Sequence, residues 1–292
     1  MDAVRIEHHS VDLDGAHLHY AELPGPGPAL VLVHGITGSY TAFLPFVAAL
    51  AAKAHVYALD LRGHYRSGHT PGAYELSDYG RDLASFLERV VRRPATVAGH
   101  SLGALVAVWV AANAPDRVHA LLLEEPPLYI TQLQRLQESP FYGFFVALRA
   151  QLAEQHAAGR TVEDLALVVG QMPVDAERTM AEVAGPAGVL QRALELQWMD
   201  PTLLDAGIEG RLLGGSDPDE LLAQVRCPAH LLVGQTEFGS ALSPQDVHRA
   251  LSKLAYGTHT LFEGVGHSIH EERPDAYVRA LSGVLDVAQA RD

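Results

Sequence analysis

Residues 97–104 read Val-Ala-Gly-His-Ser-Leu-Gly-Ala and place Ser101 in the pattern Gly-x-Ser-x-Gly. An apolar run, 95–98, leads into the pattern, and a run of small, helix-forming residues, 104–112, follows it. A serine on a sharp turn between a strand and a helix is the arrangement called a nucleophile elbow. The backbone of such a turn is strained, and side chains two residues away would collide with it, which explains the two glycines. We therefore interpret Ser101 as a nucleophile held above the edge of a sheet.

The composition of the chain bounds its class. The 292 residues are 48% hydrophobic and 19% charged, with a net charge of −14 at pH 7, which predicts one large globular domain or one domain with an insertion. The negative charge argues against nucleic acid and anionic membranes as partners. The start of the chain has no signal-peptide pattern, and no apolar stretch approaches the ~18 residues needed to span a membrane. We expect a cytoplasmic protein, either a monomer or a homodimer.

The hydrophobic pattern predicts a mostly parallel sheet. Continuous apolar runs that alternate with helical patterns are typical of strands buried on both faces by helices. Residues 4–22 instead alternate between polar and apolar side chains, which predicts two antiparallel edge strands. The predicted buried strands are 29–33, 56–59, 95–98, 118–123 and 228–233, and a last strand is predicted at 258–262.

Between residues 128 and 226 the buried strand runs disappear. Helical patterns dominate there, at 141–157, 161–170, 175–184 and 187–197. We predict an α/β core formed by 1–127 and 227–292, with a helical lid formed by 128–226. The lid region holds a cluster of large side chains, some of which we expect to face the elbow: Tyr129, Phe141, Tyr142, Phe144, Phe145, Met172, Trp198 and Met199.

Three further motifs accompany the elbow. They are His34-Gly35-Ile36-Thr37-Gly38, Asp60-Leu61-Arg62-Gly63-His64 and Gly264-Val265-Gly266-His267. With these motifs in this order and spacing, the chain resembles the α/β-hydrolase fold family along nearly its whole length. The helical region stands where that family carries its lid. One departure is Tyr65, which occupies a position where the family usually has glycine.

The resemblance implies roles for named residues. A serine hydroxyl needs a base within hydrogen-bond reach, and the base needs an orienting carboxylate. His267 stands at the position of the family's catalytic histidine. The backbone N–H groups of Leu102 and Ile36 correspond to the family's oxyanion donors, each typically worth ~3 kcal/mol in the transition state. Gly35, beside Ile36, is a candidate substrate-binding residue, as are Tyr129 and Trp198.

The carboxylate has two candidates, because family members place it after either of two neighbouring strands. Glu237 follows the predicted strand 228–233 and precedes His267 by the usual separation. Glu125 follows the strand 118–123, at the position that carries the acid in haloalkane dehalogenases and zearalenone lactonases of this family. We favour Glu125, and Glu124 then points the opposite way by strand alternation.

The resemblance implies a serine hydrolase that acts on a small-molecule carboxylic ester or lactone without metal or cofactor. Serine at position 101 disfavours dehalogenase and epoxide hydrolase chemistry, which needs aspartate there. Carbon–carbon bond hydrolysis and cofactor-free perhydrolysis remain as alternatives. A different class of function is a ligand receptor, since some plant hormone receptors keep this fold and even the triad.

Overall fold

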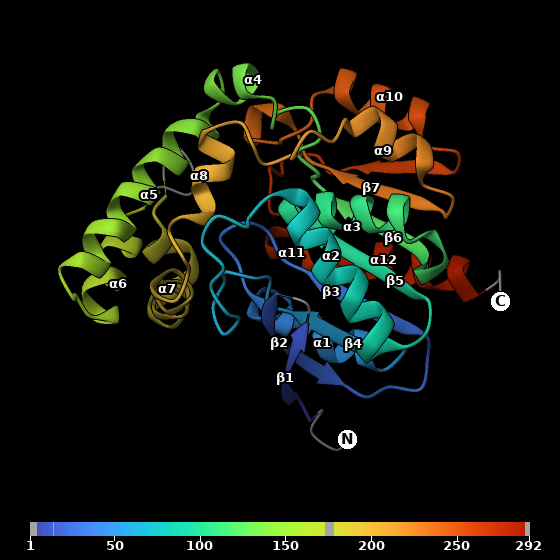
Figure 1. Ribbon diagram of the computed structural model, residues 1–292, viewed down its shortest axis with the longest axis horizontal. Coiled ribbons are helices and arrows are strands. Elements are labelled where there is room, and N and C mark those ends of the chain that lie inside the picture. Colours follow the sequence, from blue (N-terminus) through green and yellow to red (C-terminus); the bar gives the residue numbers. More distant parts are fainter. Residues whose placement is uncertain (1–4, 14, 173–177, 290–292) are drawn as a thin grey trace.

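The fold is built on one twisted sheet of eight strands, in the order β1-β2-β4-β3-β5-β6-β7-β8 (Figure 1). The computed structural model describes residues 5–13, 15–172 and 178–289. From β4 to β8 all neighbouring strands run parallel, whereas β2 is antiparallel to both β1 and β4. The predicted α/β class is confirmed, although β2 is an inner strand rather than an edge strand. The strands are β1 (Glu7–Leu13), β2 (Ala16–Leu23), β3 (Ala29–Val33), β4 (His55–Leu59), β5 (Ala95–His100), β6 (Val118–Glu124), β7 (Ala229–Val233) and β8 (Gly257–Leu261).

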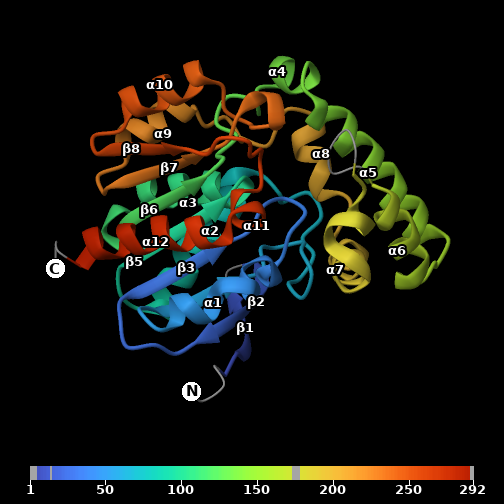
Figure 2. The same ribbon diagram turned by 180° about the vertical axis from the view of Figure 1, so that it is seen from behind.

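Helices cover both faces of the sheet. One face carries α2 (Leu76–Phe86), α3 (Leu102–Asn113), α9 (Pro218–Gln224) and α10 (Pro244–Lys253), as seen in Figure 1. The other face carries α1 (Leu44–Ala51), the short α11 (Ile269–Glu272) and α12 (Pro274–Gln289), which lie toward the viewer in Figure 2. This double covering accounts for the continuous apolar strands that the sequence showed.

Strand β3 shows how the pleat divides the core. Ala29, Val31 and Val33 belong to the hydrophobic cluster beneath α2 and α3. Leu30 and Leu32 belong to the cluster beneath α1 and α12. Successive side chains of a strand point to opposite faces, so a strand with helices on both sides must be apolar at every position.

The segment between β6 and β7 is helical, as predicted. Its helices α4 (Leu133–Gln137), α5 (Pro140–Ala157), α6 (Val162–Gln171), α7 (Met180–Gln197) and α8 (Leu203–Ile208) gather at one end of the molecule in both views (Figures 1 and 2). The predicted helix 175–184 falls partly on residues 173–177, which lie outside the described part. Its remainder and the predicted helix 187–197 form α7, which bends at Gly185, where φ is 64°.

The predicted lid, 128–226, includes α9, but in the structure α9 lies with the helices that cover the sheet. Helix α9 packs against α3 and α10 on the sheet rather than against α5 to α7. We keep the name "helical segment" for α4 to α8 alone, and its role as a lid stays a prediction. None of the helices in the described ranges has the length and apolarity required to cross a bilayer.

Tyr65, the residue at which the sequence departs from the pattern of the family it resembles, adopts a left-handed backbone with φ of 40°. Such a conformation is uncommon for a residue with a side chain. Its ring lies 6.2 Å from that of Tyr40, and the Arg66 guanidinium lies 5.3 Å from its centre. The loop therefore keeps the backbone shape that glycine would adopt and fills the space with an aromatic ring.

Candidate active site

Ser101 occupies the strained turn that the sequence predicted. The residue lies between the end of β5 and the start of α3, with a φ of 50° and a ψ of −116°. A Cβ atom at Gly99 would lie 2.3 Å from the Gly103 carbonyl oxygen, and one at Gly103 would lie 2.2 Å from that of Val33. Gly99 is thus required because the first turn of α3 lies close to it, and Gly103 because the end of β3 lies close to it. Neither glycine is required by contact with Ser101 itself.

Leu102, the first residue of α3, presents its N–H beside Ser101. The first N–H groups of a helix have no acceptor within the helix and carry its positive dipole end. This position suits an N–H that stabilises an oxyanion.

We call residues 34–39, which follow β3, the oxyanion loop. The His34 Nδ1–H donates to the Gly35 carbonyl oxygen at 2.7 Å, and its Nε2 accepts from the Leu61 N–H at 3.0 Å. Burial lowers the pKa of His34 well below its usual range, which agrees with a neutral ring that both donates and accepts. The Gly35 carbonyl shares one peptide plane with the Ile36 N–H. His34 therefore fixes the direction in which the Ile36 N–H points.

Glu125 lies next to His267. The Glu125 Oε2 is 3.3 Å from the His267 Nδ1. The same carboxylate accepts from the Gly234 N–H at 2.7 Å, the Ser240 hydroxyl at 2.8 Å and the Ala241 N–H at 2.6 Å. Its side chain is fully buried, and its φ of 49° is a second left-handed backbone at the site. Three protein donors and one histidine thus satisfy the oxygens of this buried carboxylate and fix its orientation.

Glu237, the rival acid, lies in an exposed turn after β7 and its side chain approaches the Thr236 hydroxyl at 3.4 Å. It comes from the same loop as Ser240 and Ala241, whose donors hold Glu125. In this arrangement the loop after β7 supports an acid that belongs to β6.

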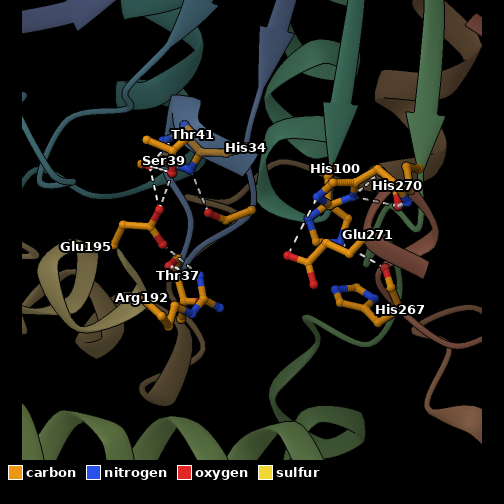
Figure 3. A network of polar contacts seen from close by, with 12 residues as sticks. His34, Thr37, Ser39, Thr41, His100, Arg192, Glu195, His267, His270 and Glu271 are labelled. Atoms are coloured by element: carbon orange, nitrogen blue, oxygen red, sulfur yellow. Dashed lines mark hydrogen bonds and ion pairs between the residues drawn. The ribbon is translucent and has the colours of Figure 1, made fainter. Parts of the chain in front are cut away.

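His267 is also fixed from the elbow. The His100 Nε2–H donates to the His267 carbonyl oxygen at 2.9 Å, and the two rings lie 4.9 Å apart (Figure 3). Burial lowers the pKa of His100 to about 3, so this ring stays neutral. The residue before Ser101 therefore anchors the loop of the candidate base. From the helical segment, the Phe141 ring meets the His267 ring edge-on at 5.2 Å.

A second acid–histidine pair lies beneath the first. Both oxygens of Glu124 are 2.9 Å from the His270 Nδ1, and one also accepts from the His270 N–H at 2.8 Å. Burial disfavours both charges, but the charge of His270 outweighs it and lowers the pKa of Glu124. Likewise, the charge of Glu124 overcomes burial and raises the pKa of His270. The two form a buried ion pair.

His100, Glu124 and His270 have ligand atoms within 4.8 Å of one another, a spacing compatible with a metal ion. Glu124 is engaged with His270 through both oxygens, and His100 Nε2 is engaged with a carbonyl oxygen. Direct hydrogen bonds therefore account for these polar atoms without a cation.

The remaining predicted substrate-binding residues lie in different surroundings. Gly35 is buried directly against the elbow, where a Cβ would lie 2.7 Å from the His100 Nδ1. Tyr129 is fully buried, its hydroxyl donates to Asp219 at 2.9 Å, and the Arg249 guanidinium lies 4.3 Å from its ring. These contacts favour a structural role for Tyr129. Trp198, at the end of α7, is 58% exposed, and its contact with a substrate stays a prediction.

Sequence reasoning missed several residues of this region. In the sequence, His34 and His64 stand out only as parts of motifs, and no local signal marks His270, Arg192 or Glu195. The His64 Nε2–H donates to the Ile36 carbonyl oxygen at 2.7 Å, which holds the next peptide of the oxyanion loop. A histidine in each of two motifs, placed after neighbouring strands, was the available signal.

Comparisons with known proteins agree with this architecture. Residues 30–280 match the profile of a family described as "Alpha/beta hydrolase family". The 2-(acetamidomethylene)succinate hydrolase of Mesorhizobium japonicum is 31% identical over 179 residues, which cover 59% of each chain. The (E)-2-((N-methylformamido)methylene)succinate hydrolase of Acinetobacter baylyi is 24% identical over 92% of this chain and 94% of its own.

Among solved structures, the enol-lactonase from Burkholderia xenovorans LB400 superimposes with a TM-score of 0.74. The sequences are 20% identical, and the match covers 95% of this chain and 100% of the lactonase. This likeness concerns the fold, since the identity is low.

Proposed function

The chain belongs to the alpha/beta hydrolase family, and from this premise we propose that it is a serine hydrolase that cleaves a carboxylic ester or lactone. Ser101 is the nucleophile, His267 the base and Glu125 the acid that orients it. The observation that carries the proposal is the 3.3 Å contact of Glu125 with His267, on the strand beside the one that leads to the strained Ser101.

The mechanism follows from these roles. His267 takes the proton of the Ser101 hydroxyl while the oxygen attacks the carbonyl carbon, and the oxyanion rests on the N–H groups of Ile36 and Leu102. The alkoxide leaves with the proton from His267. His267 then deprotonates a water molecule that attacks the acyl-enzyme, and the acid is released with Ser101 restored. Glu125 stays charged throughout and stabilises the imidazolium.

The names of two relatives favour a second candidate reaction. Both are hydrolases of succinates that carry an acylaminomethylene group. The same residues, acting by the same steps, would cleave an amide bond in a small carboxylate-bearing substrate. The bond that is cleaved distinguishes the two candidates, since the catalytic residues are shared.

A substrate panel tests the proposal. It includes p-nitrophenyl esters of graded chain length, simple and bulky lactones, acylaminomethylene succinates, a carbon–carbon substrate and a perhydrolysis assay, each with wild type and Ser101→Ala. We expect ester or lactone turnover that disappears in Ser101→Ala. Ser101-dependent turnover of the amides alone would support the second candidate. Tight ligand binding without Ser101-dependent turnover would overturn both and favour a receptor.

A further inference from the structure

The oxyanion loop is held from two sides. Within the α/β core, His34, the first residue of the loop, and His64, from the loop after β4, hold its peptides as described above. Arg192 and Glu195 also reach the loop from α7, more than 150 residues away in the sequence (Figure 3). The second set of contacts comes from the helical segment rather than from the core.

Arg192 grips Thr37, the residue that directly follows Ile36. Its Nη1 donates to the Thr37 carbonyl oxygen at 2.6 Å, and its Nη2 donates to the Thr37 hydroxyl at 2.8 Å. The guanidinium is rigid and planar, so two parallel donations fix both the position and the orientation of the peptide that it binds.

Glu195 extends the grip by two residues. Its carboxylate accepts from the Ser39 hydroxyl at 2.9 Å and from the Thr41 hydroxyl. The other oxygen lies 3.3 Å from the Arg192 Nη1. Glu195 is only 7% exposed, and a carboxylate so buried requires these partners. The contacts are therefore a built feature of the packed interface between α7 and the loop.

We propose that Arg192 and Glu195 are positioning residues that hold the Ile36 N–H in its catalytic direction and couple the oxyanion loop to α7. The inference rests on the proposed function, since it assigns a partner to one of its oxyanion donors. Catalytic groups must be held within about 0.5 Å of their productive geometry. A shift of α7 would therefore change the stabilisation of the transition state without contact between α7 and the reacting atoms.

The test compares Arg192→Ala with Arg149→Ala. Arg149 is a matched control because it belongs to the same helical segment, is similarly half-exposed and pairs with Asp205 at 2.7 Å. Removing an oxyanion donor outright costs about 10²- to 10³-fold in kcat. A donor that is only misdirected retains part of its effect, so we expect Arg192→Ala to lower kcat by roughly tenfold, with KM nearly unchanged.

Binding of a boronic acid that forms a tetrahedral adduct with Ser101 gives a second readout. We expect Arg192→Ala to weaken it by the same factor as kcat, and Arg149→Ala to leave both unchanged. Thr37→Val removes one acceptor while keeping the side-chain shape, so its effect should be smaller and should not add to that of Arg192→Ala. Thr37→Val and Arg192→Lys keep the test valid if Arg192→Ala fails to fold.

Hydrogen–deuterium exchange separates this inference from the proposed function, because it needs no turnover. We expect faster exchange of the amides in 35–41 in Arg192→Ala and Glu195→Gln, with no change in Arg149→Ala. Unchanged exchange, or a raised KM with kcat intact, would overturn the positioning role. If the two variants exchange faster but the wild-type protein shows no Ser101-dependent turnover, the positioning role stands and the proposed function alone is overturned.

Discussion

The pairs Glu125–His267 and Glu124–His270 use the same residue types from the same two regions, yet they differ in exposure and support. The His267 side chain is 22% exposed, whereas that of His270 is 2% exposed. Glu125 draws three of its hydrogen bonds from the loop after β7, whereas Glu124 binds His270 through both oxygens. The rings of Phe43, Phe46 and Tyr277 surround His270.

Under the proposed function, an acid–histidine pair serves two different purposes in this protein. A histidine that must exchange protons with a nucleophile and with water needs access and a carboxylate that is held independently of it. A histidine that is buried with its carboxylate is held in one charge state, so it anchors structure instead. The identities of the residues are equal, and their surroundings separate the roles.

Glu125→Ala removes the carboxylate from the more exposed pair, and it should have the greatest effect of the substitutions considered. Loss of the triad acid costs about 10⁴-fold in kcat in comparable enzymes, and we expect a loss of this order. Steady-state kinetics on the best substrate from the panel measures it. Glu237→Ala is the control and should retain wild-type turnover. A full loss in Glu237→Ala with activity retained in Glu125→Ala would reverse the assignment of the acid.

Glu124→Gln breaks the buried pair. Removing one partner of a buried ion pair costs about 3–5 kcal/mol in unfolding free energy, and we expect the lower end because glutamine keeps the shape. Urea denaturation measures the change. The loss of kcat in the folded protein should be far smaller than in Glu125→Ala. An unchanged unfolding free energy would contradict the anchoring role.

The pH dependence of stability sharpens the same contrast. The raised pKa of His270 means that its stabilisation is complete below about 6.5 and is lost as the pH rises through the folded pKa. The lowered pKa of Glu124 means that its contribution is present above about 4.5 and is lost on acidification through the folded pKa. The charged or titratable groups that face His270 include Glu124, Glu271, His100, Arg192 and Tyr277.

We therefore expect the difference in unfolding free energy between wild type and Glu124→Gln to be largest between pH values of about 4.5 and about 6.5. It should narrow above neutral pH by at most about 1.4 kcal/mol per pH unit. Urea titrations of both proteins across this range measure it. A difference that grows with rising pH would show that His270 is neutral in the folded protein.

The smallest expected effect concerns Phe141, the ring that meets His267 edge-on at 5.2 Å. Aromatic pairs contribute about 0.5–1.5 kcal/mol beyond the area they bury. Phe141→Ala should therefore lower kcat/KM by roughly 2- to 10-fold, while Phe141→Leu should lose less. Equal kinetics in all three proteins would mean that the ring does not influence the exposed pair.

The positions of the candidate nucleophile and the candidate base along the chain could be predicted from the sequence. The elbow at Ser101 and the loop at His267 each carry a local pattern, and strand runs place them at one edge of a parallel sheet. Between Glu125 and Glu237, the sequence could favour Glu125 but could not exclude Glu237. The choice depends on the left-handed backbone at Glu125 and on donors from a loop more than 100 residues later.

The contacts of Arg192 and Glu195 with the oxyanion loop could not be predicted from the local sequence pattern. Both residues lie on α7, and charged residues of a helix usually face water. Their partners are set by how the helical segment packs on the core. Contacts of that range are determined by the whole fold rather than by any single stretch.

The two adjacent glutamates at the end of β6 have a consequence for the growing chain. They are synthesised 142 and 146 residues before the histidines that they bind. Until β7, β8 and α11 emerge, two carboxylates that are destined for burial lack their native partners and must stay in contact with water. The elbow end of the sheet therefore closes only when the C-terminal part of the chain arrives. Under the proposed function, hydrolytic activity should thus report complete synthesis of the domain, because an N-terminal fragment holds the proposed nucleophile, Ser101, without the proposed base, His267.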